Sequence, residues 1–176
     1  AAKRSAVLEE HGLRAGEYIL LTVHRAENTD DAARLAAVFE GCADAGLPVF
    51  FPVHPRTGKA IERHGLSLPG NVAAAGPLSY VDMLAAEWGA AIVVTDSGGV
   101  QKEAYLAGVP CLTLRERTEW VQTVEAGWNL LVGVDAEELR RGIREFRPVG
   151  KRGDIFGPAD AAQRIASSVE RFVKMG

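Results

Sequence analysis

The sequence predicts an α/β fold in which a parallel sheet is covered by helices on both faces. Several stretches, Tyr18–Val23 and Ala91–Thr95 most clearly, are continuous apolar runs, which are typical of strands buried on both faces. Segments with helical spacing of apolar residues separate these runs, and such alternation indicates parallel βα units. With 176 residues, the chain has the length of one domain, so we expect residues 1–176 to form a single domain.

The first half of the chain predicts three strand–helix units after a short helix. That first helix is expected within residues 1–16, where Gly12 and Gly16 would end it. The strands are predicted at 18–23, 49–53 and, more weakly, 72–75, and the helices that follow them at 35–42, 58–64 and 79–88. Polar side chains at 28–31 are suited to cap the first of these three helices.

The second half continues the alternation with the strongest strand, 91–95, and a helix at 99–107 that is stopped by Gly108 with Pro110 behind it. Two further strands are predicted, at 111–114 and 129–132. Helices at 136–146 and 159–173 close the chain, separated by the loop Pro148–Gly157.

Composition excludes several classes of protein. Lysine and arginine number 20 against 23 aspartates and glutamates, a net charge of −3, so we expect neither a nucleic acid nor a membrane as partner. Cys42 and Cys111 lack CxxC spacing, which favours a reducing, cytoplasmic compartment. We expect no membrane span, which needs about 20 apolar residues, and no signal peptide. No residues have the spacing of a metal site, and the P-loop and GxGxxG patterns are missing, so we expect no metal and no cofactor.

Ligands of parallel α/β folds bind at the carboxyl ends of the strands, and a glycine-rich helix start follows the strand at 91–95. Ser97, Gly98 and Gly99 would present free N–H groups and the positive end of a helix dipole, which favours a phosphate. Glu103 lies about one turn later on the same face. Because a carboxylate only accepts hydrogen bonds, it suits a pair of ribose hydroxyls. The alternative is a tight turn in which Glu103 merely complements the helix dipole.

Polar residues also follow the first strand, at His24 and Arg25. A histidine can titrate near neutrality or donate to a phosphate, and an arginine is a permanent cation that suits a diphosphate. In the alternative interpretation, Asn28 or Thr29 caps the next helix and His24 packs against backbone.

Two further strand ends carry candidate residues. His54 and Arg56 follow the second strand and could contact a base or a sugar, or could simply turn the chain. The charged run 115–120 follows the strand at 111–114 and is a candidate anion clamp. A solvated loop is the better interpretation for Glu116 and Arg117 individually.

The motifs at these strand ends, taken together, closely resemble those of the non-hydrolysing UDP-N-acetylglucosamine 2-epimerases. They run in order from Tyr18 to Gly157 and comprise HRAEN at 24–28, PVHPRT at 52–57, TDSGGVQKEA at 95–104, GVP at 108–110, TEW at 118–120, EAGWN at 125–129 and LVG at 131–133. The resemblance covers only the second half of such an enzyme.

The resemblance implies a GT-B-like enzyme built from two Rossmann-like domains with the active site between them. This chain would be the carboxyl-terminal, UDP-binding Rossmann-like domain, without its amino-terminal partner. The family interconverts UDP-N-acetylglucosamine and UDP-N-acetylmannosamine by eliminating UDP to leave 2-acetamidoglucal and adding it back, with no redox cofactor. The acid and base at carbon 2 belong to the other domain, so this chain alone is expected to be inactive and monomeric. The whole enzyme is expected to be a homodimer.

By the same resemblance, the predicted site residues divide into three groups. Ser97, Gly98 and Gly99 would hold the diphosphate, Glu103 the ribose and Met83 the uracil, with Arg56 as a further UDP contact, while His24 would stand at the reacting end as the catalytic residue. Arg25, Glu27, Arg115, Thr118 and Glu119 would be diphosphate or allosteric contacts. Many relatives carry arginine where this chain has Ala26, in a region tied to allosteric substrate binding, which leaves substrate activation open here. The proline of many relatives is replaced by Val121.

Four alternatives to the non-hydrolysing epimerase are considered. The hydrolysing epimerases are a close one, but they typically lack the His-Arg-x-Glu-Asn form of the motif at 24–28. A GT-B glycosyltransferase donor domain also seats a nucleotide diphosphate on a glycine-rich helix start, but the motif at 24–28 argues against it. A non-catalytic nucleotide-sugar-binding module fits a chain without the second domain. Asp96 ends a strand as the aspartate of a phospho-acceptor receiver does, yet His24 and Arg25 stand where a receiver needs acidic metal ligands.

Overall fold

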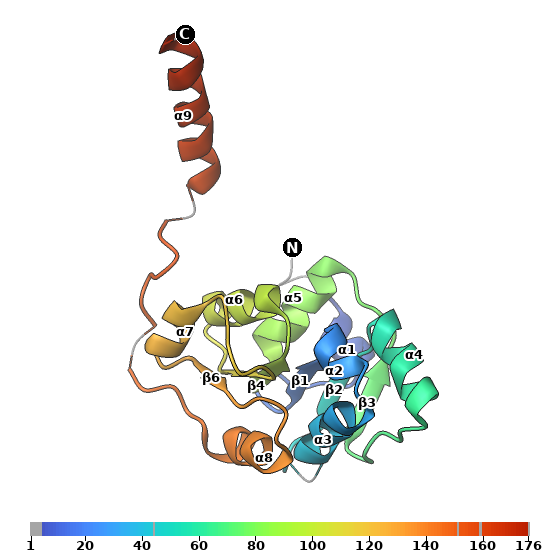
Figure 1. The fold of residues 1–176 in the computed structure, drawn as a ribbon. Helices are drawn as coiled ribbons and strands as arrows, with labels where there is room; N and C mark the ends of the chain where they lie inside the picture. The colour runs from blue at the N-terminus through green and yellow to red at the C-terminus, as the bar shows by residue number, and fades with distance from the viewer. Residues whose placement is uncertain (1–4, 44, 151, 159, 176) are drawn as a thin grey trace.

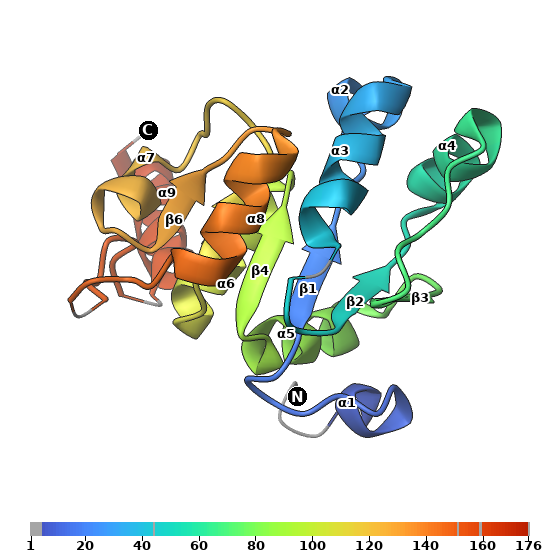
Figure 2. The ribbon, with the colours of Figure 1, turned by 90° about the horizontal axis from the view of Figure 1, so that it is seen from below.

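The computed structural model of the chain describes residues 5–43, 45–150, 152–158 and 160–175. Within these residues one six-stranded sheet has the order β3-β2-β1-β4-β5-β6 (Figure 2), and every strand pair is parallel. The strands are β1 (Ile19–Thr22), β2 (Val49–Pro52), β3 (Val72–Ala75), β4 (Ile92–Thr95), β5 (Cys111–Thr113) and β6 (Asn129–Leu131). The strand order reverses between β1 and β4, which is the point where ligands bind in doubly wound sheets.

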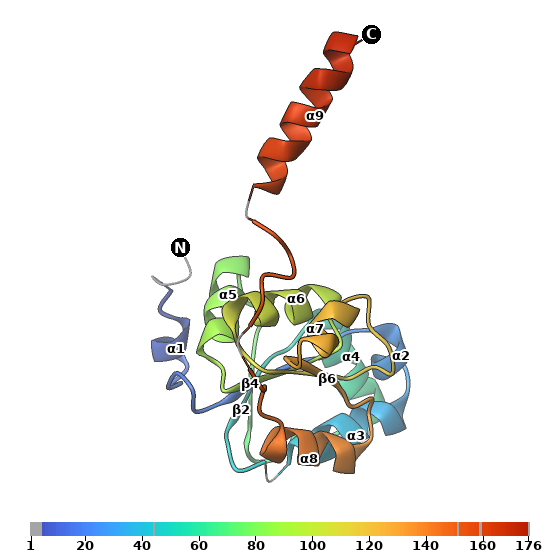
Figure 3. The same ribbon diagram turned by 90° about the vertical axis from the view of Figure 1, so that its left-hand side faces the viewer.

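Helices cover both faces of the sheet, as Figure 3 shows. The helices are α1 (Val7–Glu10), α2 (Ala26–Thr29), α3 (Ala32–Cys42), α4 (Pro55–His64), α5 (Tyr80–Gly89), α6 (Gly98–Ala107), α7 (Val121–Glu125), α8 (Ala136–Glu145) and α9 (Ala161–Met175). One apolar core joins the sheet to α3, α4 and α8, and a second joins it to α1, α5 and α6. The predicted Rossmann-like α/β fold is therefore confirmed.

Close packing of α3 against α8 depends on a glycine. A β-carbon on Gly41 would lie only 2.7 Å from Cδ2 of Leu139, which no real side chain tolerates. Gly41 thus allows the two helices to approach, and Leu139 is fully buried in the core between them and the sheet. The strands beneath follow the predicted pattern, because every residue of β1, β2 and β4 is buried.

Several boundaries differ from the prediction for local reasons. Helix α4 begins at Pro55 rather than 58, because proline is favoured in the first turn of a helix and Nδ1 of His54 accepts from the N–H of Arg56 at 3.1 Å. The first helix spans only Val7–Glu10, and residues 1–4 of the predicted range lie outside the described residues. The short helices α2 and α7 were not predicted, since four or five residues are too few to show a helical period.

Helix α9 stands clear of the rest of the fold in Figures 1 and 3. Its exposed apolar side chains, Ile165, Val169, Phe172 and Val173, are spaced so that they share one face. The preceding segment is attached to the body through Tyr105, whose hydroxyl donates to the carbonyl of Gly153 at 2.8 Å. None of the described helices combines the length and the apolar composition that crossing a membrane requires.

Candidate nucleotide-binding site

A buried carboxylate, Asp96, joins the ends of the two central strands. It follows β4 directly and is fully buried. Its oxygens accept from the backbone N–H groups of His24 at 3.1 Å and Arg25 at 2.9 Å, and from Nδ2 of Asn28 at 3.1 Å. The turn after β1 is thereby fixed beside the start of α6. The sequence analysis considered Asp96 only as a phospho-acceptor and missed this role.

The glycine-rich start of α6 lies at the same edge of the sheet. The hydroxyls of Thr22 and Thr95 are 2.5 Å apart across β1 and β4, and Oγ1 of Thr95 also accepts from the N–H of Ser97 at 2.9 Å. The Ser97 hydroxyl caps α6 by accepting from Val100 N at 3.5 Å. The first N–H groups of a helix have no partner within it. Those of Gly98 and Gly99 are therefore placed to bind an anion, as predicted, and phosphate binding itself stays a prediction.

His24 and Met83 line one shallow hollow beside this helix start. Nδ1 of His24 lies 3.6 Å from Oδ1 of Asp96, and its ring centroid is 5.2 Å from that of His54. The hollow has a volume of about 200 Å³ and is lined by Thr22, His24, Pro52, His54, Pro77, Leu78, Met83 and Val100. Its apolar walls suit a flat base or the apolar side of a sugar.

Arg56, predicted as a UDP contact, is engaged elsewhere. Its Nε donates to Oγ1 of Thr29 at 2.9 Å and its Nη2 to Oδ2 of Asp30 at 2.7 Å. These bonds tie α4 to the end of α2. His64 also contacts this region through the carbonyl of Thr29 at 3.1 Å.

Glu103 is half-buried and lies on α6 about one turn after Gly99. The Tyr80 hydroxyl donates to its Oε1 at 3.1 Å, and this bond raises the pKa of Tyr80. One carboxylate oxygen of Glu103 therefore has a protein donor, which leaves the second for a ligand such as a ribose. Tyr80 was not among the predicted site residues.

Glu87 on α5 is fully buried close to Glu103. Neither of its carboxylate oxygens has a hydrogen-bond partner among the described residues. Burial, reinforced by the charge of Glu103, raises the pKa of Glu87 to about 8. Glu87 therefore keeps its proton to a higher pH than an exposed glutamate does.

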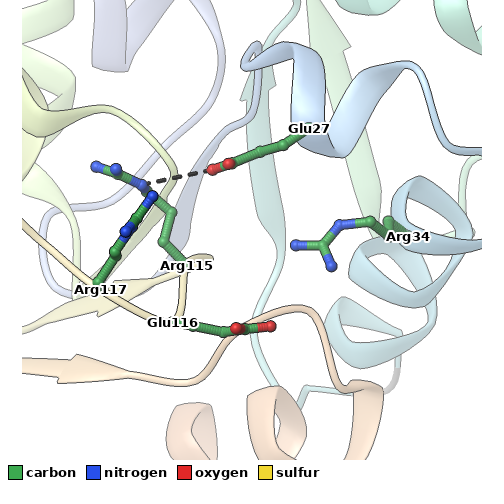
Figure 4. A pocket seen from close by; sticks show the side chains of 5 residues that line it. All are labelled: Glu27, Arg34, Arg115, Glu116 and Arg117. Atoms are coloured by element: carbon green, nitrogen blue, oxygen red, sulfur yellow. Dashed lines mark ion pairs between the residues drawn. The ribbon is translucent and has the colours of Figure 1, made fainter.

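Four of the predicted diphosphate or allosteric contacts form one chain of ion pairs. Arg115, only 9% exposed, approaches Glu27 at 3.5 Å and donates to Glu119 at 2.7 Å, while Arg25 lies 3.8 Å from Glu119. The bond from Arg115 lowers the pKa of Glu119 to about 2. The adjoining pocket has a volume of about 440 Å³. Its lining residues, Glu27, Arg34, Arg115, Glu116 and Arg117, are drawn in Figure 4. Glu116 and Arg117, expected to belong to a solvated loop, are exposed.

The fifth of these predicted contacts, Thr118, faces inward. Its hydroxyl donates to Oε1 of Gln101 at 2.5 Å and accepts from the N–H of Trp120 at 3.0 Å. Gln101 is in turn bonded to Asn129. The sequence analysis did not single out Gln101 or Asn129, and the only signal available was that polar residues stand at core positions of a helix and a strand.

A parallel α/β sheet with this strand order, with a glycine-rich helix start at its switch point, belongs to the Rossmann-like class of folds. Residues 1–170 match the family model described as "UDP-N-acetylglucosamine 2-epimerase". The chain belongs to this family, and the resemblance identified from its motifs is confirmed.

Individual relatives agree with the family assignment. The chain is 40% identical over 168 residues to a UDP-N-acetylglucosamine 2-epimerase homolog of Methanococcus maripaludis, which covers 93% of this chain and 47% of the relative. It is 42% identical over 154 residues to the UDP-2,3-diacetamido-2,3-dideoxy-D-glucuronate 2-epimerase of Pseudomonas aeruginosa, covering 85% and 43%. The crystal structure of the Methanocaldococcus jannaschii UDP-GlcNAc 2-epimerase in complex with UDP-GlcNAc and UDP superposes with a TM-score of 0.85 at 34% identity, covering 99% of this chain and 50% of that one.

The chain spans about half the length of the curated relatives it matches.

Proposed function

We propose that this chain is the carboxyl-terminal, UDP-binding half of a non-hydrolysing UDP-N-acetylglucosamine 2-epimerase. The observation that carries the proposal is the junction of β1 and β4, where Asp96 holds His24 beside the helix start Ser97–Gly99. A donor-rich helix start then lies beside an apolar hollow lined by His24 and Met83, which suits a ligand that carries both a diphosphate and a base. Family membership and the relative crystallised with UDP-GlcNAc and UDP support this assignment.

In the proposed reaction, the bond between carbon 1 and the UDP oxygen breaks as a proton leaves carbon 2. Negative charge then develops on the departing diphosphate. The N–H groups of Gly98 and Gly99 and the guanidinium of Arg25 would stabilise that charge, because preorganised donors aimed at developing charge lower the barrier. Glu103 would orient the ribose and Met83 the uracil, and His24 would act at the sugar end. Re-addition of UDP to carbon 1 and of a proton to the other face of carbon 2 gives the epimer.

Proton transfer at carbon 2 needs an acid and a base within hydrogen-bond reach. We assign these groups to an amino-terminal half that this chain does not contain, so the chain alone is not expected to epimerise. The complete enzyme would be a cytoplasmic homodimer without a cofactor. Cys42 and Cys111 are both buried and unpaired, which is compatible with a reducing compartment.

The sugar is the least determined part of the substrate. The name of the Pseudomonas aeruginosa relative points to a second candidate, a UDP-linked 2,3-diacetamido uronic acid. Both candidates carry UDP and an acetamido group at carbon 2. Combining this chain with an amino-terminal half of the family and assaying the two UDP-sugars in parallel would distinguish them. Binding of a UDP-sugar with no epimerisation of either would instead favour the nucleotide-sugar-binding module.

Calorimetric titration of this chain with UDP and ADP tests the nucleotide assignment. We expect UDP to bind weakly, since one wall of the cleft is missing, and at least tenfold more tightly than ADP, a difference of about 1.4 kcal/mol. Uridine should bind more weakly than UDP because it lacks the diphosphate. Equal affinities for UDP and ADP would support an anion site and contradict the proposed preference for uridine. If neither nucleotide binds, the proposal is wrong.

A further inference from the structure

A set of buried hydrogen bonds connects α6 to the loop 115–120. Gln101 on α6 is fully buried, and its Oε1 accepts from the Thr118 hydroxyl at 2.5 Å and from Nδ2 of Asn129 at 3.2 Å. Asn129 is 2% exposed, and its Oδ1 accepts from the Thr113 hydroxyl at 2.7 Å. When the partner of a buried polar side chain is removed, the protein is destabilised by the full desolvation penalty of the group left unpaired. These bonds therefore fix the geometry of the side chains that share them.

The bonds continue from Thr118 to the backbone of Trp120. The Trp120 N–H donates to the Thr118 hydroxyl at 3.0 Å, and the Trp120 carbonyl accepts from the Thr123 hydroxyl at 2.7 Å. Nδ2 of Asn129 also donates to the Thr123 hydroxyl, at 3.1 Å. The Trp120 N–H is thus linked through the Thr118 hydroxyl to the side-chain amide of Gln101. The Trp120 carbonyl is linked through the Thr123 hydroxyl to the side-chain amide of Asn129.

Trp120 and its neighbour Glu119 lie over the first residue of α6. The position that a β-carbon of Gly98 would occupy is 3.4 Å from Nε1 of Trp120 and 3.5 Å from Oε2 of Glu119. An indole N–H donor and a carboxylate therefore border Gly98, the first residue of α6. A shift of the loop by about one ångström would change the space that a phosphate could enter.

Several other contacts of this loop involve partly exposed side chains. The Arg115–Glu119 and Arg25–Glu119 pairs share a Glu119 side chain that is 55% exposed, and solvent weakens an ion pair at such a site. Lys102 lies over the Trp120 ring at 5.1 Å, and the Trp120 ring meets the Phe156 ring edge-on at a centroid distance of 5.6 Å. The bonds to Gln101 have fixed direction and are shielded from water.

We propose that Gln101, acting through Thr118, is a positioning residue that holds the segment 118–120 against the start of α6 and so sets the space open to the diphosphate. The inference rests on the proposed UDP binding. It predicts that loss of this link weakens binding of the diphosphate and spares the nucleoside, because the hollow at Met83 shares no residue with the segment 118–120. Thr118 then acts from inside the loop instead of contacting the ligand.

Two variants of Thr118 form a matched pair for the test. Thr118→Val keeps the shape and removes the hydroxyl that donates to Gln101 and accepts from Trp120, whereas Thr118→Ser keeps the hydroxyl. We expect Thr118→Val to bind UDP at least tenfold more weakly than the parent chain, with uridine affinity changed less than twofold. Thr118→Ser should remain within twofold of the parent for both. Amide exchange at Trp120 should be faster in Thr118→Val and unchanged in Thr118→Ser.

Gln101→Met separates positioning from direct contact. Gln101 is fully buried and cannot reach a ligand, so a positioning role requires Gln101→Met to weaken UDP binding as Thr118→Val does. If Gln101→Met binds UDP normally while Thr118→Val does not, Thr118 contacts the ligand itself and the inference is wrong. Equal losses of UDP and uridine affinity, or unchanged UDP affinity in Thr118→Val, also overturn it. Failure of the parent chain to bind UDP overturns the proposed function instead.

Discussion

Two regions of the molecule bury a carboxyl group, and they treat it in opposite ways. At the ends of β1 and β4, Asp96 accepts from two backbone N–H groups and one side-chain amide. Between α5 and α6, Glu87 is equally inaccessible to solvent, and neither of its oxygens has a partner among the described residues. Burial alone therefore does not decide what such a group does.

The difference follows from the backbone around each group. Where β1 ends, the chain turns and its N–H groups at His24 and Arg25 are released from the sheet, so a carboxylate can collect them. Inside α5 and α6 the backbone N–H groups already donate to carbonyls of the same helix, so they are not available to Glu87. A carboxylate organises structure in the first region, and only a neutral acid is tolerated in the second.

Replacing Asp96 should have the largest effect. In Asp96→Asn the negative charge is lost, and one oxygen becomes an NH₂ group that faces the N–H of His24, which approaches both oxygens of Asp96. Hydrogen bonds to a charged group contribute about 1.5–3 kcal/mol each, and we expect a loss of about 2–4 kcal/mol in the free energy of unfolding, measured in urea. The control is Asp31→Asn at the exposed cap of α3, where asparagine caps as well as aspartate. Equal losses in both variants would contradict the role given to Asp96.

Glu87→Gln should have an effect that grows as pH rises and that is the smaller of the two below about pH 6. The pKa of Glu87 is raised from 4.5 to about 8 in the folded chain. Between these values the unfolded chain has released the proton and the folded chain keeps it, so the stability of the parent falls as pH rises from about 4.5 to 8. One pKa unit corresponds to about 1.4 kcal/mol, and the full cost is a few kcal/mol above pH 8.

Melting temperatures across this range provide the measurement. Glu87→Gln cannot ionise, so we expect it to be more stable than the parent at pH 8 and to match it near pH 4. Glu62→Gln, at an exposed site on α4, serves as the control and should follow the parent at every pH. A parent whose stability does not fall between pH 5 and 8 would show that Glu87 finds a partner in solution.

Glu103 is the intermediate case, half-buried with one protein donor, and its role is tested through the ligand. Glu103→Gln keeps the size and loses the charge, so about 1.5–3 kcal/mol of hydrogen bonding to ribose should be lost, or roughly one to two decades of UDP affinity by calorimetry. Discrimination between UDP and its 2′-deoxy analogue should also fall. His24→Ala should instead weaken UDP more than uridine. If Glu103→Gln keeps the ribose preference and His24→Ala affects both ligands equally, both placements are wrong.

The sequence was sufficient for the sheet and for the edge that carries the site. The apolar runs at β1 and β4 and the glycine-rich start of α6 are local features, and the rule that ligands bind at the carboxyl ends of strands connects them. The partners of Asp96 could not be predicted, because they are backbone groups about 70 residues away. Nor could the inward orientation of Thr118 or the engagement of Arg56 by Thr29 and Asp30, which depend on how α6, α4 and α2 pack.

The strand order also has a consequence for how the chain folds. The strands β2 and β3, or β4 and β5, are close in sequence, whereas β1 pairs with β4 so that Thr22 and Thr95 meet across 73 residues. Contacts between distant residues form slowly, because the loop entropy is lost before the contact is gained. The two halves of the sheet are therefore expected to assemble first, and the proposed nucleotide site appears only when they join. A nucleotide that binds this site would stabilise the last long-range contact of folding and would slow its opening.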